Sequence, residues 1–191
     1  MAGPFTVVGQ YDVTNSGTRY AGVQATAAAI PISNTTSPKA CLWNTSPNVK
    51  CDLERISFGW VTTTEAPGNF LLNVLTATGA AAGTGLPLTA FTAGVLNTTV
   101  FSTKLGGGTV PQAQFGTAAT LTTAGVPFMT LGMSHLTTTG ASTAVPGWQM
   151  DYFFYDSVIL LPNVLVYPTA SAATSSTYNV SIWWREVPLT D

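Results

Sequence analysis

Two segments decide the fold: Ser157-Val-Ile-Leu-Leu-Pro-Asn-Val-Leu-Val-Tyr-Pro168 and Tyr178-Asn-Val-Ser-Ile-Trp-Trp-Arg-Glu-Val-Pro-Leu189. The first is almost continuously apolar, which is typical of a strand covered on both faces. In the second, apolar and polar residues alternate with the two-residue period of a half-buried strand. One face of this strand would carry Tyr178, Val180, Ile182 and Trp184. We expect a closing hairpin around the polar loop 169–177. Because its long arms need earlier strands as partners, the sequence predicts an all-β fold with non-local pairing.

Charged residues are scarce, at 7% of the chain, against about 25% in a typical soluble domain. Thr, Ser, Ala, Gly and Asn replace them, while the apolar fraction of 46% is ordinary. This composition indicates either a β protein with Thr-rich strand faces or a surface that identical subunits cover, since it offers little charge repulsion. The net charge of −2 disfavours a nucleic-acid partner, which requires a basic footprint.

The N-terminal stretch 1–17 reads as an arm that precedes a single domain over residues 18–191. It holds a short apolar run with Phe5 and Val7, followed by turn-forming residues. Such an arm either lies across a neighbouring subunit or is a frayed terminus. The stretch has neither a basic region nor a long apolar segment, so we expect no secretory signal. The sequence contains no run of about 18 apolar residues, so we expect no membrane span.

Residues 40–61 predict an earlier hairpin, with a turn at 45–48 that contains Pro47. In the return strand Leu53 and Ile56 have opposite parity, so we expect a β-bulge near Glu54 and Arg55. Further strands are expected around residues 70–75, within 88–105, and at 115–121, 126–136 and 148–155. Uneven strand spacing and long Ala/Gly/Thr loops favour an antiparallel β-sandwich over a meander barrel.

The chain offers few residues that could carry out catalysis, so we expect a non-enzymatic protein without metal or cofactor. His135 is the only histidine and cannot form a histidine-based metal cluster. Asp52 and Glu54 share a strand face, where they would bind a cation or face Lys50 and Arg55.

A second acidic pair, Asp151 and Asp156, flanks an aromatic run, as sugar-cleaving carboxylates would. Chance pairs of this kind are common on strands. No nucleophile, base and orienting group can be assembled from these residue types, which makes an enzyme the least favoured class.

Cys41 and Cys51 lie on the two arms of the hairpin predicted at residues 40–61. Strand parity places them on opposite faces, which disfavours a disulfide. A three-residue turn centred on Ser46 would instead set them opposite each other. Reduced thiols are the favoured interpretation.

Trp183 and Trp184 are adjacent and therefore point to opposite faces of a strand. One belongs in the core, and the other, with Arg185 nearby, contacts a second sheet or another subunit. Trp and Arg are common at interface hot spots, so Trp183 and Arg185 join Phe5 and Val7 as candidate contact residues. The alternative is a sugar-binding platform formed by Trp148, Tyr152 and Tyr155.

Four segments of the chain resemble the hairpins of virion proteins of tailed bacteriophages. They are residues 160–167 and 180–188, and the earlier Leu42-Trp-Asn-Thr-Ser-Pro47 and Leu53-Glu-Arg-Ile-Ser-Phe58. In those proteins the closing turn usually reads Pro-Gly, where this chain has Asn163, and the last strand ends in Trp-x-Glu, here Trp184-Arg-Glu186.

The resemblance covers about a third of the chain and implies a jelly-roll-type sandwich in a particle-bound, often trimeric protein. Such a protein is a head decoration or cement protein, or a fibre domain, made in the host cytoplasm. The partners implied are copies of itself and a major capsid protein. The alternative class is a tail adhesin or carbohydrate-binding module, with a glycan as ligand.

Overall fold

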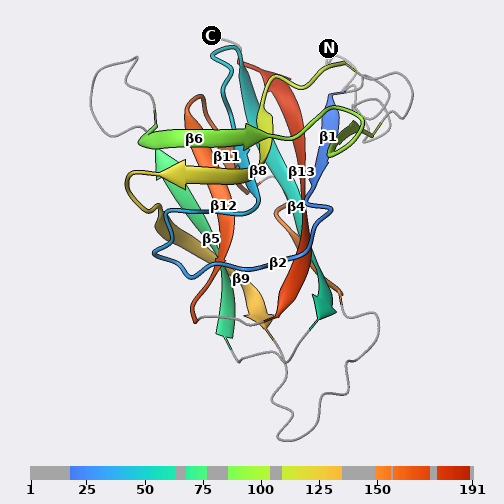
Figure 1. Cartoon of the computed structure of the whole chain (residues 1–191). Helices are drawn as coiled ribbons and strands as arrows, with labels where there is room; N and C mark the ends of the chain where they lie inside the picture. Colours follow the sequence, from blue (N-terminus) through green and yellow to red (C-terminus); the bar gives the residue numbers. More distant parts are fainter. Residues whose placement is uncertain are drawn as a thin grey trace, which may run out of the picture.

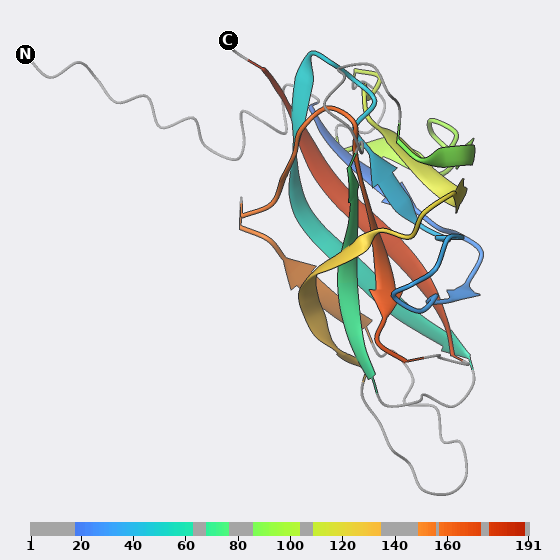
Figure 2. The same ribbon diagram turned by 90° about the vertical axis from the view of Figure 1, so that its left-hand side faces the viewer.

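The fold is an antiparallel β-sandwich, as the sequence predicted. The structure is a computed structural model, and it describes residues 18–62, 68–76, 86–103, 109–134, 149–155, 157–172 and 176–189. Figures 1 and 2 show two sheets packed as layers, with the described residues forming strands and connecting segments and no helix. The predicted jelly-roll connectivity stays a prediction. The arm of residues 1–17 lies outside the described residues.

The seven-stranded sheet, called sheet A, contains the strand with the clearest sequence alternation. Its main order is β10 (Gln149–Phe153), β4 (Val49–Thr62), β13 (Thr177–Pro188), β1 (Arg19–Val23) and β7 (Val100–Ser102). Two short strands complete it: β11 (Ile159–Leu160) beside β4 and β2 (Ala28–Ala29) beside β13.

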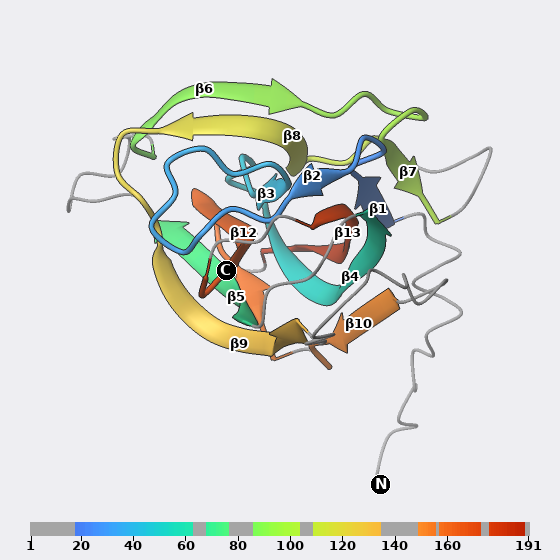
Figure 3. The ribbon, with the colours of Figure 1, turned by 60° about the horizontal axis from the view of Figure 1, so that its bottom comes forward.

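The six-stranded sheet, called sheet B, packs against it. Its order is β6 (Leu88–Ala93), β8 (Gln114–Leu121), β3 (Cys41–Trp43), β12 (Val164–Ala170), β5 (Gly68–Thr76) and β9 (Val126–Ser134). Figure 3 separates the strands of sheet B from those of sheet A. The strands expected from the sequence therefore exist, and the main core lies between the two sheets.

Strand β13 has the predicted alternation. Its inner face buries almost completely Tyr178, Val180, Ile182 and Trp184. The register with β4 confirms the bulge: Trp183 pairs with Arg55 and Trp184 with Leu53, which leaves Glu54 as the extra residue. Both predictions followed from side-chain parity alone.

The predicted closing hairpin is wrong, because its two arms lie in different sheets. Strand β12 pairs with β3 and β5 in sheet B, whereas β13 pairs with β4 and β1 in sheet A. The segment between them therefore passes from one sheet to the other. The prediction that this apolar segment is a strand covered on both faces is confirmed, since apolar residues pack on both faces of β12.

The predicted hairpin over residues 40–61 is wrong for the same reason, since β3 belongs to sheet B and β4 to sheet A. The buried side chain of Asn44 holds this crossing. Its Nδ2 donates to the carbonyls of Val49, at 2.8 Å, and Leu160, at 3.0 Å. Fixing these backbone groups turns the chain between layers instead of back along one sheet.

Cys41 and Cys51 are free, buried and on strands of different sheets, in agreement with the predicted reduced thiols. Burial raises the pKa of the Cys41 thiol to about 12. Burial, followed by the negative charges of Glu186 and Asp52, also raises the pKa of Cys51. Neither thiol is activated as a nucleophile.

A buried carboxylate joins β13 to the segment before β8. Glu186 accepts hydrogen bonds from the backbone N–H groups of Gln112, at 2.9 and 3.0 Å, and Ala113, at 2.9 Å. The indole Nε1 of Trp184 also donates to it, at 3.2 Å. These donors replace the water that the carboxylate loses on burial.

Part of the outer face of sheet B carries a second apolar cluster and lies under the chain between β2 and β3, which runs in front of β12 and β5 in Figure 1. The buried Asn73 ties this segment down by donating to the carbonyls of Ser33, at 2.6 Å, and Gly125, at 3.3 Å, and by accepting from Thr169. Segments of the chain itself therefore occupy part of the outer face of sheet B.

Gly22 is expected to be indispensable to the packing of the two sheets. A Cβ at this position of β1 would lie 2.2 Å from Cγ of the buried Phe115 across the sandwich. We expect Gly22→Ala to lower the free energy of unfolding by about 1–3 kcal/mol, measured by urea denaturation. The matched control is Gly59→Ala, whose Cβ would meet only the Asn179 carbonyl, at 3.8 Å. Equal effects of the two substitutions would contradict the proposed contact.

Candidate functional site

The described charges gather on one face. Of the nine charged residues in the described ranges, seven project from the outer face of sheet A: Arg19, Lys50, Asp52, Glu54, Arg55, Asp151 and Arg185. Their strand neighbours, among them Tyr20, Leu53 and Trp184, point into the core. In a chain so poor in charge, this concentration marks the face as chemically distinct.

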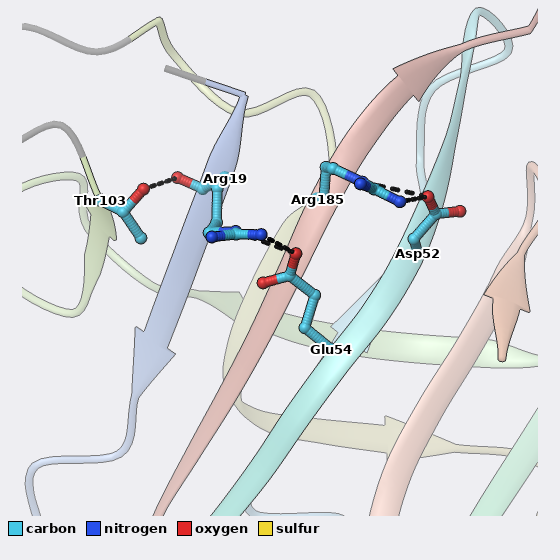
Figure 4. Close-up of polar contacts among 5 residues, drawn as sticks. All are labelled: Arg19, Asp52, Glu54, Thr103 and Arg185. Atoms are coloured by element: carbon cyan, nitrogen blue, oxygen red, sulfur yellow. Dashed lines mark hydrogen bonds and ion pairs between the residues drawn. The ribbon is translucent and has the colours of Figure 1, made fainter. Parts of the chain in front are cut away.

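Two ion pairs hold three strands of this face together (Figure 4). The Arg185 guanidinium contacts Oδ2 of Asp52 through Nη2, at 2.6 Å, and Nε, at 3.2 Å. From β1, Nη2 of Arg19 contacts Oε1 of Glu54 on β4, at 2.8 Å, and so spans the intervening β13. The bulge at Glu54 gives that side chain its outward position.

These pairs replace the partners expected from the sequence. Asp52 and Glu54 do share the outer face, but arginines from β13 and β1 occupy their carboxylates instead of Lys50 and Arg55. Sequence reasoning overlooked Arg19 because the order of strands within a sheet is needed to bring it here. Among the residues that the structure describes, no group of three or more His, Cys, Asp or Glu side chains could hold a metal ion.

A row of aromatic and cationic side chains runs beside the ion pairs. The Arg55 guanidinium lies over the Trp183 ring, 4.3 Å from its centroid, and 5.7 Å from the centroid of Phe153. Phe153 in turn contacts Tyr155, with centroids 6.0 Å apart. We call Trp183, Arg55, Phe153 and Tyr155 the Arg55 row. Each neighbouring pair is within the range of cation–π or aromatic attraction.

Backbone geometry presents the end of this row to solvent. Tyr155 is 86% exposed and has a φ of 48°, an unfavourable conformation for a bulky residue. The turn is anchored on the buried Phe154, whose N–H donates to the Glu54 carbonyl at 3.0 Å and whose carbonyl accepts from Ser157 N–H at 2.9 Å. Strain of this kind persists where surrounding contacts enforce it and is frequent at binding sites.

Asp151 borders the row. Its carboxylate accepts hydrogen bonds from the hydroxyl of Ser57 and from Nε2 of Gln149, at 3.1 and 3.0 Å. Desolvation acts to raise its pKa, but these two donors and the positive charge of Arg55 together hold the pKa below its ordinary value. Asp151 is therefore a charged acceptor.

The tryptophan pair is divided as predicted. Trp184 is buried against Tyr20, with centroids 5.6 Å apart, whereas Trp183 lies on the outer side with Arg55. Arg185 is also on the outer face, engaged with Asp52. The contact role proposed for Trp183 and Arg185 stays a prediction.

The residues of the predicted sugar platform are placed differently. Tyr152 turns inward, where it packs on the core and on Phe154 with ring centroids 5.0 Å apart, while Tyr155 projects outward. Phe153, which sequence reasoning missed, lies beside Tyr155 instead. Strand alternation in the aromatic run was the signal that could have found it. Outside the described residues lie Phe5, Val7, His135, Trp148 and Asp156.

An open depression of about 470 Å³ lies at the end of the face, lined by Thr18, Lys50, Asp52, Arg185, Glu186, Val187 and Pro188. Oδ1 of Asp52 is buried there without a hydrogen-bond partner among the described residues, although Oδ2 is fully engaged. The depression is charged but shallow. Among the described residues, no helix is long and apolar enough to cross a membrane.

The pKa of Asp151 provides a test of this geometry. We expect NMR titration of its carboxyl carbon to give a midpoint below the ordinary value of 3.8, and Ser57→Ala to raise that midpoint by removing a donor to the ionised form. Because the folded-state pKa is depressed, the stabilisation is present above the unfolded-state pKa and is lost as pH falls through the folded value. Ser181→Ala, one strand further away, is the matched control and should leave the midpoint unchanged.

Comparison of the chain with protein-family models, with curated proteins and with solved structures finds no match.

Proposed function

We propose that this chain is a non-enzymatic structural protein of a phage particle, namely a decoration or cement protein that binds the capsid lattice as a trimer. The resemblance of its strand segments to phage virion proteins supports the assignment to a phage particle. The charge-poor sandwich and the composition of one face support a role in contacts between proteins.

The Arg55 row is the observation that carries the proposal. Trp, Tyr and Arg are the residues most enriched at energetic hot spots of protein interfaces, and here they adjoin one another on an exposed sheet face. The neighbouring strand β11 adds Ile159, 47% exposed, and Leu161 follows it, 54% exposed. Burial of large apolar side chains grouped in this way by a partner lowers the free energy of the complex.

Binding would act on the particle through mass action. A protein that binds the assembled lattice and not the free capsid subunit stabilises the lattice by the free energy of its own binding. Several linked copies add avidity, because the second contact forms at a high effective concentration. The two ion pairs that link β1, β4 and β13 restrain the contact face, which lowers the ordering cost of binding.

A head-binding assay tests this function. We expect the wild-type protein to co-sediment with purified heads of the phage that encodes it, and Phe153→Ser to weaken that binding about 30-fold, the effect of losing a hot-spot side chain of about 2 kcal/mol. The matched control is Phe128→Ser on β9 of sheet B, since Phe128 is 56% exposed and Phe153 47%. Failure of the wild-type protein to bind heads would refute the proposal.

Glycan binding is the second candidate, favoured by one observation. The exposed rings of Phe153 and Tyr155 adjoin the carboxylate of Asp151 and the amide of Gln149, which combines apolar stacking surface with oriented polar groups. On a glycan array, we expect any specific signal to disappear in Tyr155→Ala and to persist in Phe128→Ala. An array on which the wild-type protein binds nothing would eliminate this candidate.

A further inference from the structure

Next to the ion pairs, side chains from β10, β4 and β13 form three cross-strand rows on the outer face of sheet A. The strand register defines the rows as Phe153, Arg55 and Trp183, then Asp151, Ser57 and Ser181, then Gln149, Gly59 and Asn179. The first row is aromatic and cationic, whereas the other two hold only small or polar residues. Along the strands, the face therefore changes from apolar surface to hydrogen-bonding groups.

The third row has no side chain at its centre. A Cβ at Gly59 would meet only the carbonyl oxygen of Asn179, at 3.8 Å, so the space above β4 is open there. Gln149 and Asn179, which flank this position, are both exposed. We call the position the Gly59 gap. Ser57, the next outward residue of β4, is also small, so a flat ligand can lie close to the backbone of this strand.

The groups around the Gly59 gap both donate and accept hydrogen bonds. The side-chain amide of Asn179 has no hydrogen-bond partner among the described residues. Oδ2 of Asp151 receives only the bond from Gln149, at 3.0 Å, and so has acceptor capacity left for a further donor. Hydroxyl groups, which donate and accept at once, match this mixture of partners.

Arg55 adds a cation without a counter-ion. Arg19 and Arg185 each contact a carboxylate, at 2.8 and 2.6 Å, but no carboxylate of the described residues lies within ion-pair distance of Arg55. Its guanidinium carries donors in a planar fork that matches a carboxylate, and the Trp183 ring beneath it restricts its position. By charge complementarity, a ligand that bears a carboxylate fits this end of the face.

The spacing of Arg55 and Asp151 orients such a ligand. Arg55 is opposite Phe153, two residues beyond Asp151 on β10, which corresponds to roughly 7 Å along the strand at about 3.4 Å per residue. This length is comparable to a pyranose ring measured from a carboxylate substituent to the hydroxyls on its far side. The reverse orientation would bring the carboxylate of the ligand against that of Asp151, and the two like charges would repel each other.

We propose that the outer face of sheet A binds a carboxylated pyranose, namely a hexuronic or sialic acid residue of a glycan. The carboxylate pairs with Arg55, and the ring lies over Ser57 and the Gly59 gap. The hydroxyls donate to Asp151 and exchange hydrogen bonds with Asn179, while the exposed rings of the Arg55 row cover the apolar side of the sugar. The inference rests on the glycan-binding candidate, whose ligand class it names, and is independent of lattice binding.

NMR titration of the isotope-labelled protein with matched acidic and neutral sugars tests the proposal. Sialyllactose is compared with lactose, and digalacturonic acid with galactobiose, which separates the two sources of a carboxylated ring. We expect at least one acidic probe to bind about tenfold or more tightly than its neutral counterpart, the effect of one hydrogen-bonded charge pair. Its affinity should fall as the salt concentration rises.

Two substitutions separate charge from shape. Arg55→Gln removes the cation, and Gly59→Val fills the Gly59 gap, where an added side chain meets no close neighbour in the fold. Each should weaken binding of the acidic probe about tenfold or more. The matched controls are Lys39→Gln, an exposed cation away from this face, and Ala90→Val, an exposed position of β6 in sheet B. Neither control should change the affinity.

Urea unfolding shows whether each variant is folded. Arg55→Lys, which keeps the charge without the planar fork, replaces Arg55→Gln if the latter does not fold. Three results would overturn the inference: acidic probes that do not bind, neutral probes that bind equally well, or Arg55→Gln and Gly59→Val proteins that bind like the controls. Tighter binding of a glutamate tripeptide than of either acidic sugar would also overturn it and would assign Arg55 to a protein partner.

These outcomes are distinguishable from failure of the proposed functions. Equal binding of the neutral probes leaves the glycan-binding candidate intact, whereas an empty glycan array removes that candidate together with this inference. Co-sedimentation with phage heads is measured without any sugar, so it tests lattice binding separately.

Discussion

Burial of one face of β13 holds the sandwich together. Tyr178, Val180, Ile182 and Trp184 enter the core from this strand, while its backbone pairs with β4 on one side and β1 on the other. At roughly 1.5–3 kcal/mol for each large apolar side chain, this single face contributes a substantial share of the driving force for packing. The other strands of sheet A are aligned relative to β13, so the positions of their outward side chains follow from it.

The same alternation that builds the core also builds the outer face. Because Trp184 points inward, Trp183 must point outward, and because β4 has a bulge at Glu54, both Glu54 and Arg55 reach the outer side. One extra residue thus supplies an ion pair and a cation–π contact on the same strand. The outer face of sheet B has no comparable concentration of charge among the described residues. Part of it lies under the segment between β2 and β3, which Asn73 holds through Ser33.

Side-chain parity could be read from the sequence, and it correctly predicted strand positions, the inner face of β13, the bulge and the division of the tryptophan pair. Strand pairing could not be read, because both apparent hairpins are crossings between sheets and nothing in a local pattern specifies the layer of the next strand. The partners of Asp52 and Glu54 were missed for that reason. Tyr152 and Tyr155 differ in parity, so strand alternation could have separated them, but the positive φ at Tyr155, two residues beyond the end of β10, has no sequence signal.

The position of β13 in the order of synthesis has a consequence for how the protein matures. The other strands that the structure describes in the two sheets are all translated before it, yet β13 lies between β4 and β1 at the centre of sheet A. Until it emerges from the ribosome, those strands have unpaired edges and an exposed inner face. Closure of long-range contacts is slow, and open edges favour aggregation, so the nascent chain depends on rapid insertion of β13 or on protection by chaperones.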